Sequence, residues 1–87
     1  MGDVFAACDR ELLGKTLEEG EIHFEVRESF YGTEPLSVER LAELLHEFGN
    51  VNLVGKKCVG IAIKKGFASE SNTIRIKNVP HLQIFRI

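Results

Sequence analysis

Thiols, carboxylates and imidazoles are the side chains through which this 87-residue sequence could perform covalent chemistry. The candidate catalytic residues are Cys8, Asp9 and His81, with His23 as a further candidate. A nucleophilic thiol needs its pKa lowered by a histidine, a cation or a helix N-terminus. Cys8 precedes a short segment that can form a helical turn, and His81 follows a proline in a rigid turn, where it could act as a base. The sequence therefore permits a small enzyme or a ligand-binding protein that uses these residues.

Packing is the simpler interpretation of the two thiols. Free cysteine is among the most buried residue types in proteins. Cys8 ends an apolar segment, and Cys58 lies on an apolar stripe fifty residues further along the chain. Two cysteines are too few for a disulfide-built miniprotein, so we expect free thiols and a cytoplasmic location. Catalysis by Cys8, Asp9 and His81 stays open as the alternative.

Familiar cofactor and metal motifs are missing from the sequence, which contains no CxxC, HExxH or GxGxxG pattern. Gly55 and Gly60 have the spacing of a phosphate-binding loop, but Ile61 and Ala62 stand where that loop needs Lys and Ser or Thr. We therefore expect no cofactor and no metal site. No apolar run approaches the roughly 18 residues of a membrane span, so no membrane partner is expected either.

Charge is divided unevenly between the two halves of the chain. Residues 1–50 hold four Lys or Arg and twelve Asp or Glu, which gives a net charge of −8. Residues 51–87 hold seven and one, which gives a net charge of +6. The two halves could fold over each other and neutralise, or a basic face could be turned toward a polyanion.

A basic face beside aromatic side chains suits single-stranded RNA. Lys57 and Lys64 are seven residues apart and would share one face of a helix, and a second basic pair alternates along a strand. Phe30 and Tyr31 could stack on unpaired bases, or they could anchor their loop on the core. The predicted binding residues are Lys56, Lys57, Lys64, Lys65, Arg75, Lys77, Phe30 and Tyr31.

Three functional classes follow from these patterns. We favour a non-catalytic binding module that contacts RNA or a ribonucleoprotein through the basic C-terminal half. The alternative is a protein-interaction or homodimer module that uses an exposed sheet edge or an acidic helix face. The further alternative is the small enzyme or ligand-binding protein described above.

Hydrophobic periodicity predicts the elements that carry these residues. The apolar run 4–8 is typical of a buried strand, and residues 22–26 alternate as in a strand with one dry face. Residues 29–35 read as a loop. Ser37 stands at the N-cap of a helix over 38–48, whose leucines at positions 41, 44 and 45 should be largely buried.

The C-terminal half is less regular. Apolar residues between 51 and 63 fit a helix or a strand, and length favours a helix over 53–65 capped by Asn50 or Asn52. Residues 74–77 predict a strand, 78–81 a turn, and 82–87 a last strand. The element order β, β, α, α, β, β predicts a single α+β domain over 1–87, with two helices packed on a short, mostly antiparallel sheet.

Four segments carry a resemblance: AACDRELLGKT at 6–16, ESFYG at 28–32, NLVGKK at 52–57 and NVPH at 78–81. In this order they resemble the small archaeal uncharacterised family catalogued as domain of unknown function 424. The resemblance spans nearly the whole chain. It implies a compact α+β domain in the archaeal cytoplasm and favours helix over strand for 53–65, but it implies no activity.

Overall fold

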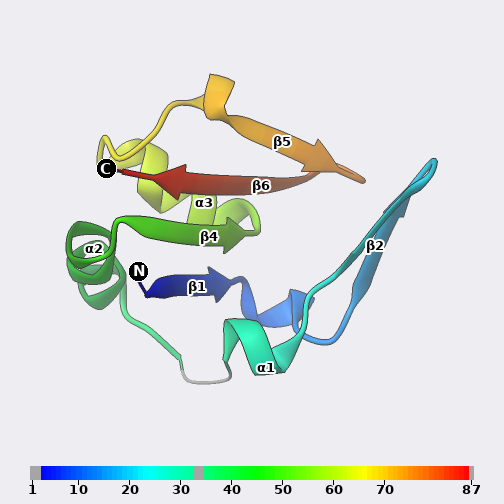
Figure 1. Cartoon of the computed structure of the whole chain (residues 1–87), viewed down its shortest axis with the longest axis horizontal. Coiled ribbons are helices and arrows are strands. Elements are labelled where there is room, and N and C mark those ends of the chain that lie inside the picture. Colours follow the sequence, from blue (N-terminus) through cyan, green and yellow to red (C-terminus); the bar gives the residue numbers. More distant parts are fainter. Residues whose placement is uncertain (1–2, 33–34, 87) are drawn as a thin grey trace.

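A four-stranded mixed sheet forms the centre of the molecule, and the computed structural model describes residues 3–32 and 35–86 around it (Figure 1). The strand order is β1-β4-β6-β5. β1 (Val4–Cys8) runs parallel to β4 (Asn50–Val54), whereas β6 (Val79–Phe85) is antiparallel to both β4 and β5 (Thr73–Ile76). The predicted α+β class, with mostly antiparallel pairing, is confirmed.

Among the described residues, three α-helices and a separate hairpin complete the fold, whereas the sequence predicts two helices. α1 (Glu28–Tyr31) is a single turn inside a segment expected to be a loop. α2 (Val38–Glu47) and α3 (Lys56–Lys64) pack on one face of the sheet. The hairpin of β2 (Thr16–Glu19) and β3 (Ile22–Glu25) projects from one end of the sheet (Figure 1).

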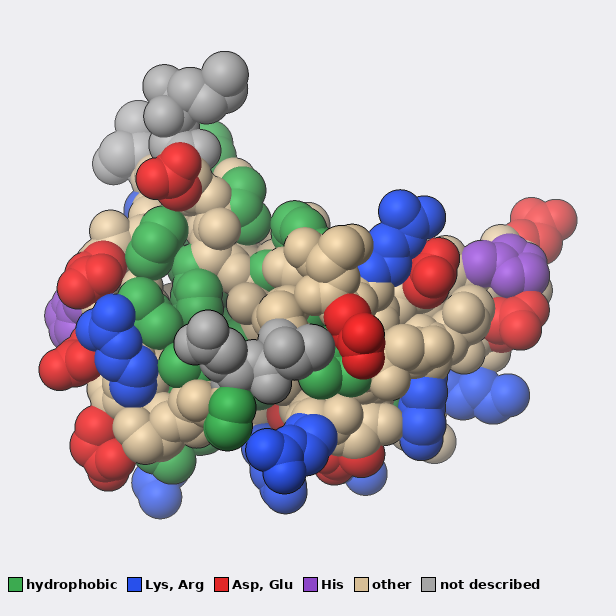
Figure 2. All heavy atoms as spheres, turned by 90° about the horizontal axis from the view of Figure 1, so that it is seen from below, with side chains coloured by type: hydrophobic (Ala, Val, Ile, Leu, Met, Phe, Trp, Pro, Cys, Tyr) green, Lys and Arg blue, Asp and Glu red, His purple; other side chains and the backbone are tan. Residues whose placement is uncertain are grey.

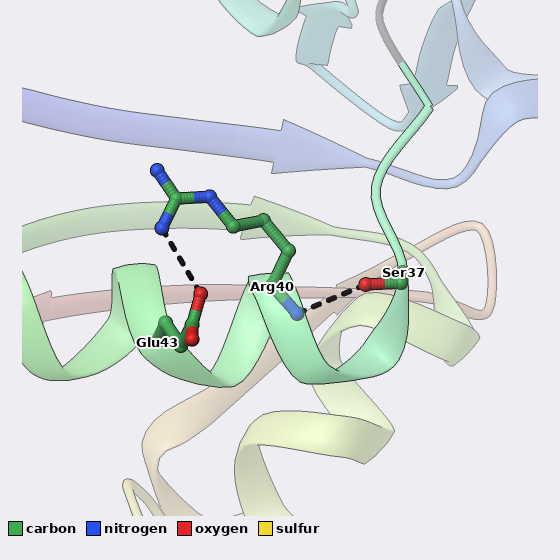
Figure 3. Close-up of polar contacts among 3 residues, drawn as sticks. All are labelled: Ser37, Arg40 and Glu43. Atoms are coloured by element: carbon green, nitrogen blue, oxygen red, sulfur yellow. Dashed lines mark hydrogen bonds and ion pairs between the residues drawn. The ribbon is translucent and has the colours of Figure 1, made fainter.

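The start of α2 follows the sequence prediction closely. The Ser37 hydroxyl accepts a hydrogen bond from the backbone N–H of Arg40 at 3.0 Å, and the Arg40 guanidinium reaches Glu43 one turn later (Figure 3). Such a cap satisfies one of the N–H groups that a helix start leaves without a partner. Leu41 and Leu45 are buried as expected, but Leu44 is only partly buried because it lies at the margin of the apolar stripe.

The predicted helix over 53–65 is wrong at its start, because residues 53 and 54 belong to the central strand β4 and the helix begins only at Lys56. Asn50 and Asn52 lie in that strand and cap nothing; Gly55 is the residue before α3. Gly55 has φ +118°, a backbone conformation that residues other than glycine rarely adopt. This φ is not helical, so a helix cannot continue through Gly55. A Cβ there would stand 2.3 Å from Cγ of Asp9, which is why a glycine is needed.

The C-terminal hairpin also differs from its prediction. Lys77 and Asn78 both have positive φ and form the turn, so Pro80 lies inside β6 rather than in a turn. Two consecutive positive φ angles are typical of the tight turns that join antiparallel strands. The last predicted strand ends at Phe85, and its outer limit, Ile87, lies outside the described residues.

The two faces of the sheet carry separate cores. The face under α2 and α3 is formed by buried side chains such as Val51, Leu53 and Leu82. The opposite face carries a smaller cluster of Val26, Tyr31 and Val54, covered by α1 and the base of the hairpin. Ile22, expected on a dry face, is exposed because the far end of the hairpin extends past the sheet.

Within residues 3–32 and 35–86, no helix has the length and apolarity that crossing a membrane requires.

Candidate nucleic-acid interface

Exposed lysines occupy both ends of α3. Lys56 and Lys57 begin the helix, Lys64 ends it and Lys65 follows, and all four are exposed. None of them takes part in an ion pair within the described residues, and α3 contains no acidic residue. Between them lies Gly60, where a Cβ would meet no atom within 4 Å. The outer face of α3 is therefore open and positively charged.

Helix stability does not explain the first two of these lysines. The N-terminus of a helix carries partial positive charge, so cations there are unfavourable by a few tenths of a kcal/mol or more. Lys56 and Lys57 occupy that first turn, where acidic residues are absent. Their placement is therefore not accounted for by the helix dipole.

The remaining predicted basic residues stand differently. Arg75 pairs with Pro80 in the sheet, on the same face as Leu82 and hence as α3, and its guanidinium lies 3.6 Å from the Glu70 carboxylate. Lys77 lies in the β5–β6 turn, and its backbone N–H donates to a carboxylate oxygen of Glu19 in the hairpin at 2.6 Å. The structure thus gathers the lysines of α3, places Arg75 on their side of the sheet, and sets Lys77 against the hairpin.

Seen from below, Lys and Arg side chains recur along the lower margin of the molecule (Figure 2). Histidine and acidic side chains occur at the opposite end of the molecule and also at the end where the β2–β3 hairpin projects (Figure 2). There His23, one of the candidate catalytic residues, pairs with Glu18 at 3.0 Å and is exposed. His23 lines neither of the two cavities described below.

Phe30 and Tyr31, the aromatic pair of α1, differ in burial and therefore in role. Tyr31 is buried and its hydroxyl donates to the side-chain oxygen of Asn52 at 2.7 Å, so it anchors α1 on the sheet. Phe30 is 49% exposed, with its ring packed edge-on against Tyr31 at a centroid distance of 4.9 Å. Phe30 is thus available for stacking on a ligand, and the Tyr31 ring serves mainly as its support.

Asn52 is the residue that sequence reasoning missed. Its side-chain oxygen receives the Tyr31 hydroxyl and also lies 3.1 Å from Nε2 of His81. The His81 ring stacks on Phe24 at a centroid distance of 4.7 Å. An asparagine inside an apolar strand was the available signal, because a half-buried amide needs partners. Periodicity instead places Asn52, like Asn50, at a possible helix cap.

Asp9 has a structural task. Its two carboxylate oxygens accept hydrogen bonds from the backbone N–H groups of Lys57 and Cys58, each at 3.0 Å. The buried Asp9 side chain thus caps α3 from a position just after β1. Asp9 and Lys57 are forty-eight residues apart in sequence. The N-terminus of α3 is already occupied by this carboxylate, so the helix start holds no separate anion.

The proposed partnership of Cys8 and His81 does not form. Both residues belong to one row of the sheet, but Val54 stands between them, on β4. Two strand spacings correspond to about 10 Å, which is too far for proton transfer between the side chains.

The thiols and the imidazole are also poorly suited to nucleophilic chemistry. Burial, with the charges of Asp9 and Glu11, raises the pKa of Cys8 to about 11, so its thiol stays protonated at neutral pH. Burial raises the pKa of Cys58 still further. Burial lowers the pKa of His81, which keeps that imidazole neutral. Both cysteines are free.

A cavity of about 330 Å³, here called the edge cavity, opens beside β1 where α1, α2 and α3 approach one another. Cys8 and Asp9 line its inner wall, and Arg10 and Lys57 add positive charge. A second, more open pocket of about 380 Å³, here called the Asn52 pocket, lies on the other side of Tyr31. Its described lining consists of Phe24, Glu25, Arg27, Ser29, Phe30, Tyr31 and Asn52.

Over the described parts of the chain, His, Cys, Asp and Glu residues form no group of three or more that could hold a metal ion.

Comparisons with known proteins extend these observations. A solved structure, that of an uncharacterized conserved protein from the archaeon Methanopyrus kandleri, is similar in fold with a TM-score of 0.77 at 24% identity, and the match covers 97% of this chain and 83% of that one. No curated protein matches the chain. The model of the family described as "Protein of unknown function (DUF424)" matches residues 1–87, which confirms the resemblance carried by the motifs: the chain belongs to the DUF424 family.

Proposed function

We propose that this protein is a non-catalytic binding module that contacts RNA, free or within a ribonucleoprotein, through the outer face of α3. The observation that carries the proposal is the set of exposed lysines on α3, which have no ion-pair partner among the described residues. Unpaired lysines can release counterions from phosphates without first breaking internal ion pairs. Arg75 extends the positive charge on the same side of the sheet.

Both thiols of the chain support a cytoplasmic location for this function. Cys8 and Cys58 are free, which suits a reducing compartment. The high pKa of Cys8 supports a binding role over a catalytic one, because a nucleophilic cysteine needs its thiolate form.

The test is a salt titration of the affinity for a short single-stranded RNA. The parent chain should bind with a log–log slope of about −0.7 per phosphate contact. Replacing Lys57 and Lys64 by alanine should weaken binding to all sequences alike and flatten the slope by about 1.4, because two contacts are lost.

A second double variant serves as the matched control. Lys15→Ala with Arg40→Ala removes the same charge from the acidic half of the chain, outside α3. It should leave the slope unchanged. Equal losses in the two double variants, or no binding by the parent at low salt, would contradict the proposal.

A protein-interaction or homodimer module is the second candidate, and the uncovered part of the sheet favours it. Val4, Asn50 and Phe85 share one row on the face opposite α3, where Val4 is 46% and Phe85 75% exposed. Exposed apolar side chains grouped in this way often mark an interface. A parent chain that self-associates and binds no RNA in the same titration would favour this candidate.

A further inference from the structure

The side-chain amide of Asn52 is held in one orientation by two residues that contact its oxygen. Its oxygen has two lone pairs, and the Tyr31 hydroxyl and His81 Nε2 approach that oxygen at 2.7 and 3.1 Å. Tyr31 keeps its proton, since burial raises its pKa to about 12, and it therefore donates. His81 must also donate from Nε2, because the amide oxygen that faces it can only accept a hydrogen bond. The acceptor capacity of Asn52 is thus filled by the protein itself.

The other end of the amide is free to act on a ligand. The Asn52 NH₂ group has no partner among residues 3–32 and 35–86, and no buried side-chain nitrogen there lacks a partner, so this group must border solvent-accessible space. That space is the Asn52 pocket. The Asn52 NH₂ group can only donate, and the Asn52 oxygen is already engaged. This side chain therefore selects a ligand that presents a hydrogen-bond acceptor.

The walls of the pocket suit a flat ring. Phe24 is held by its stack on His81, and Phe30 is held edge-on by Tyr31, while both line the pocket. Phe30 remains half exposed and can cover one face of a ring. Glu25, also on the wall, offers a carboxylate acceptor that Arg27 holds at 3.2 Å. The pocket therefore combines an aromatic surface and the Asn52 donor with the ion pair of Glu25 and Arg27, whose carboxylate is an acceptor and whose guanidinium is a second donor.

We propose that the Asn52 pocket binds an unpaired base that presents a ring carbonyl beside a ring N–H, as uracil does. The carbonyl would accept from the Asn52 amide, the ring N–H would donate to Glu25, and the ring would stack on Phe30. That the base belongs to an RNA chain rests on the function proposed above. Asn52 lies on the face of the sheet opposite α3, and the buried Tyr31 separates its pocket from the edge cavity, whose wall includes Lys57. An RNA that reaches both sites therefore passes around the β1 edge of the sheet.

This arrangement discriminates between bases. Adenine has no carbonyl, and cytosine carries its carbonyl beside a ring nitrogen that has no proton and would face the Glu25 carboxylate. The paired contacts by which asparagine reads adenine are also excluded, because they need a free amide oxygen. Guanine shares the pattern of uracil and would be accepted.

The experiment compares the affinities of the full chain for ten-nucleotide oligomers of U, C and A at one salt concentration. The U oligomer should bind about 3- to 10-fold more tightly than the other two, which is the effect of one or two hydrogen bonds. Asn52→Asp keeps the acceptor for Tyr31 and His81 but replaces the NH₂ donor by an oxygen, so the preference for U should vanish. Phe30→Ala should weaken binding to every oligomer by about tenfold through lost stacking.

Three controls separate this inference from the proposed function. Lys57→Ala should lower the affinity for all oligomers equally and leave the U preference intact. Lysine-dependent binding with equal affinities for U, C and A would overturn the pocket and leave the α3 interface standing. If no oligomer binds, the proposal of an RNA interface on α3 is contradicted, and an NMR titration with free uridine then tests the Asn52 pocket. A shift of the Asn52 side-chain NH₂ signals would support the pocket as a nucleoside site. Unchanged signals would overturn it. The parent chain alone suffices for the oligomer and uridine arms, so misfolding of the Asn52→Asp variant leaves the test intact.

Discussion

At the scale of single residues, Asp9 shows how a side chain that resembles a catalytic carboxylate serves the fold. Both of its oxygens accept backbone N–H groups of α3, and Gly55 leaves the space that its carboxylate fills. A buried carboxylate requires such partners, because an unpaired one would carry a large desolvation penalty. The segments CDRELLGK and NLVGKK, which carry part of the family resemblance, therefore meet at one structural contact.

The neighbouring thiol gives the prediction at this scale. Since the pKa of Cys8 is about 11, its thiolate fraction at pH 7 should be far below that of an unperturbed cysteine. A thiol reagent should label native Cys8 at least about tenfold more slowly than the same residue in the urea-unfolded chain, and the rate should keep rising with pH up to about 11. Labelling followed by mass spectrometry checks this, with Cys8→Ser as the control that assigns the signal. Rapid labelling of Cys8 near neutral pH would revive the catalytic interpretation.

At the scale of elements, α3 follows one glycine and contains another, and the two have opposite requirements. Gly55 has positive φ and lies against Asp9, whereas Gly60 lies in the exposed middle of the helix. The first glycine is required by its conformation and by the close approach of another side chain. The second weakens a helix that alanine would favour.

These glycines form a matched pair of variants. Gly55→Ala should destabilise the protein by about 3 kcal/mol, because it combines an unfavourable φ with a clash against Asp9. Gly60→Ala should stabilise it by about 0.5–1 kcal/mol. Urea unfolding followed by circular dichroism measures both free energies. Similar effects of the two changes would mean that α3 does not begin at Gly55.

At the scale of the whole molecule, backbone contacts rather than ion pairs join the two charge regions of the sequence within the described residues. Each of the four ion pairs among the described residues lies within one half of the chain: three lie within residues 1–50, and the fourth joins Arg75 to Glu70. The contact from the Lys77 backbone to Glu19 crosses between the halves, but it leaves the Lys77 ammonium unpaired. The acidic hairpin and the lysines of α3 thus form different regions of one surface.

This separation predicts an unusual chromatographic behaviour. The protein carries a net charge of −2, yet it should be retained on a heparin column at pH 7 and low salt, because the α3 lysines are exposed and unpaired. Lys57→Ala with Lys64→Ala should elute at lower salt than Lys15→Ala with Arg40→Ala, although the two variants have equal net charge. Elution of both variants at the same salt concentration would show that net charge alone governs retention.

Local interactions explain which features could be predicted correctly without the structure. The apolar spacing and the Ser37 cap of α2 involve residues three or four positions apart, so the pattern could be read directly. The apolar strand 4–8, the α+β class and the family resemblance were also accessible. Likewise, the lysines at 56, 57, 64 and 65 were recognised as basic candidates from composition alone.

Tertiary contacts decided the remainder. Whether residues 50–54 form a strand depends on β1 and β6 pairing on either side, and the break at Gly55 depends on Asp9, far away in sequence. The same holds for Asn52, whose amide is oriented by Tyr31 and His81 from two other elements. Periodicity records only which positions are apolar, whereas strand pairing and side-chain networks join residues that meet only after folding. The binding pocket proposed here was for that reason visible only in three dimensions.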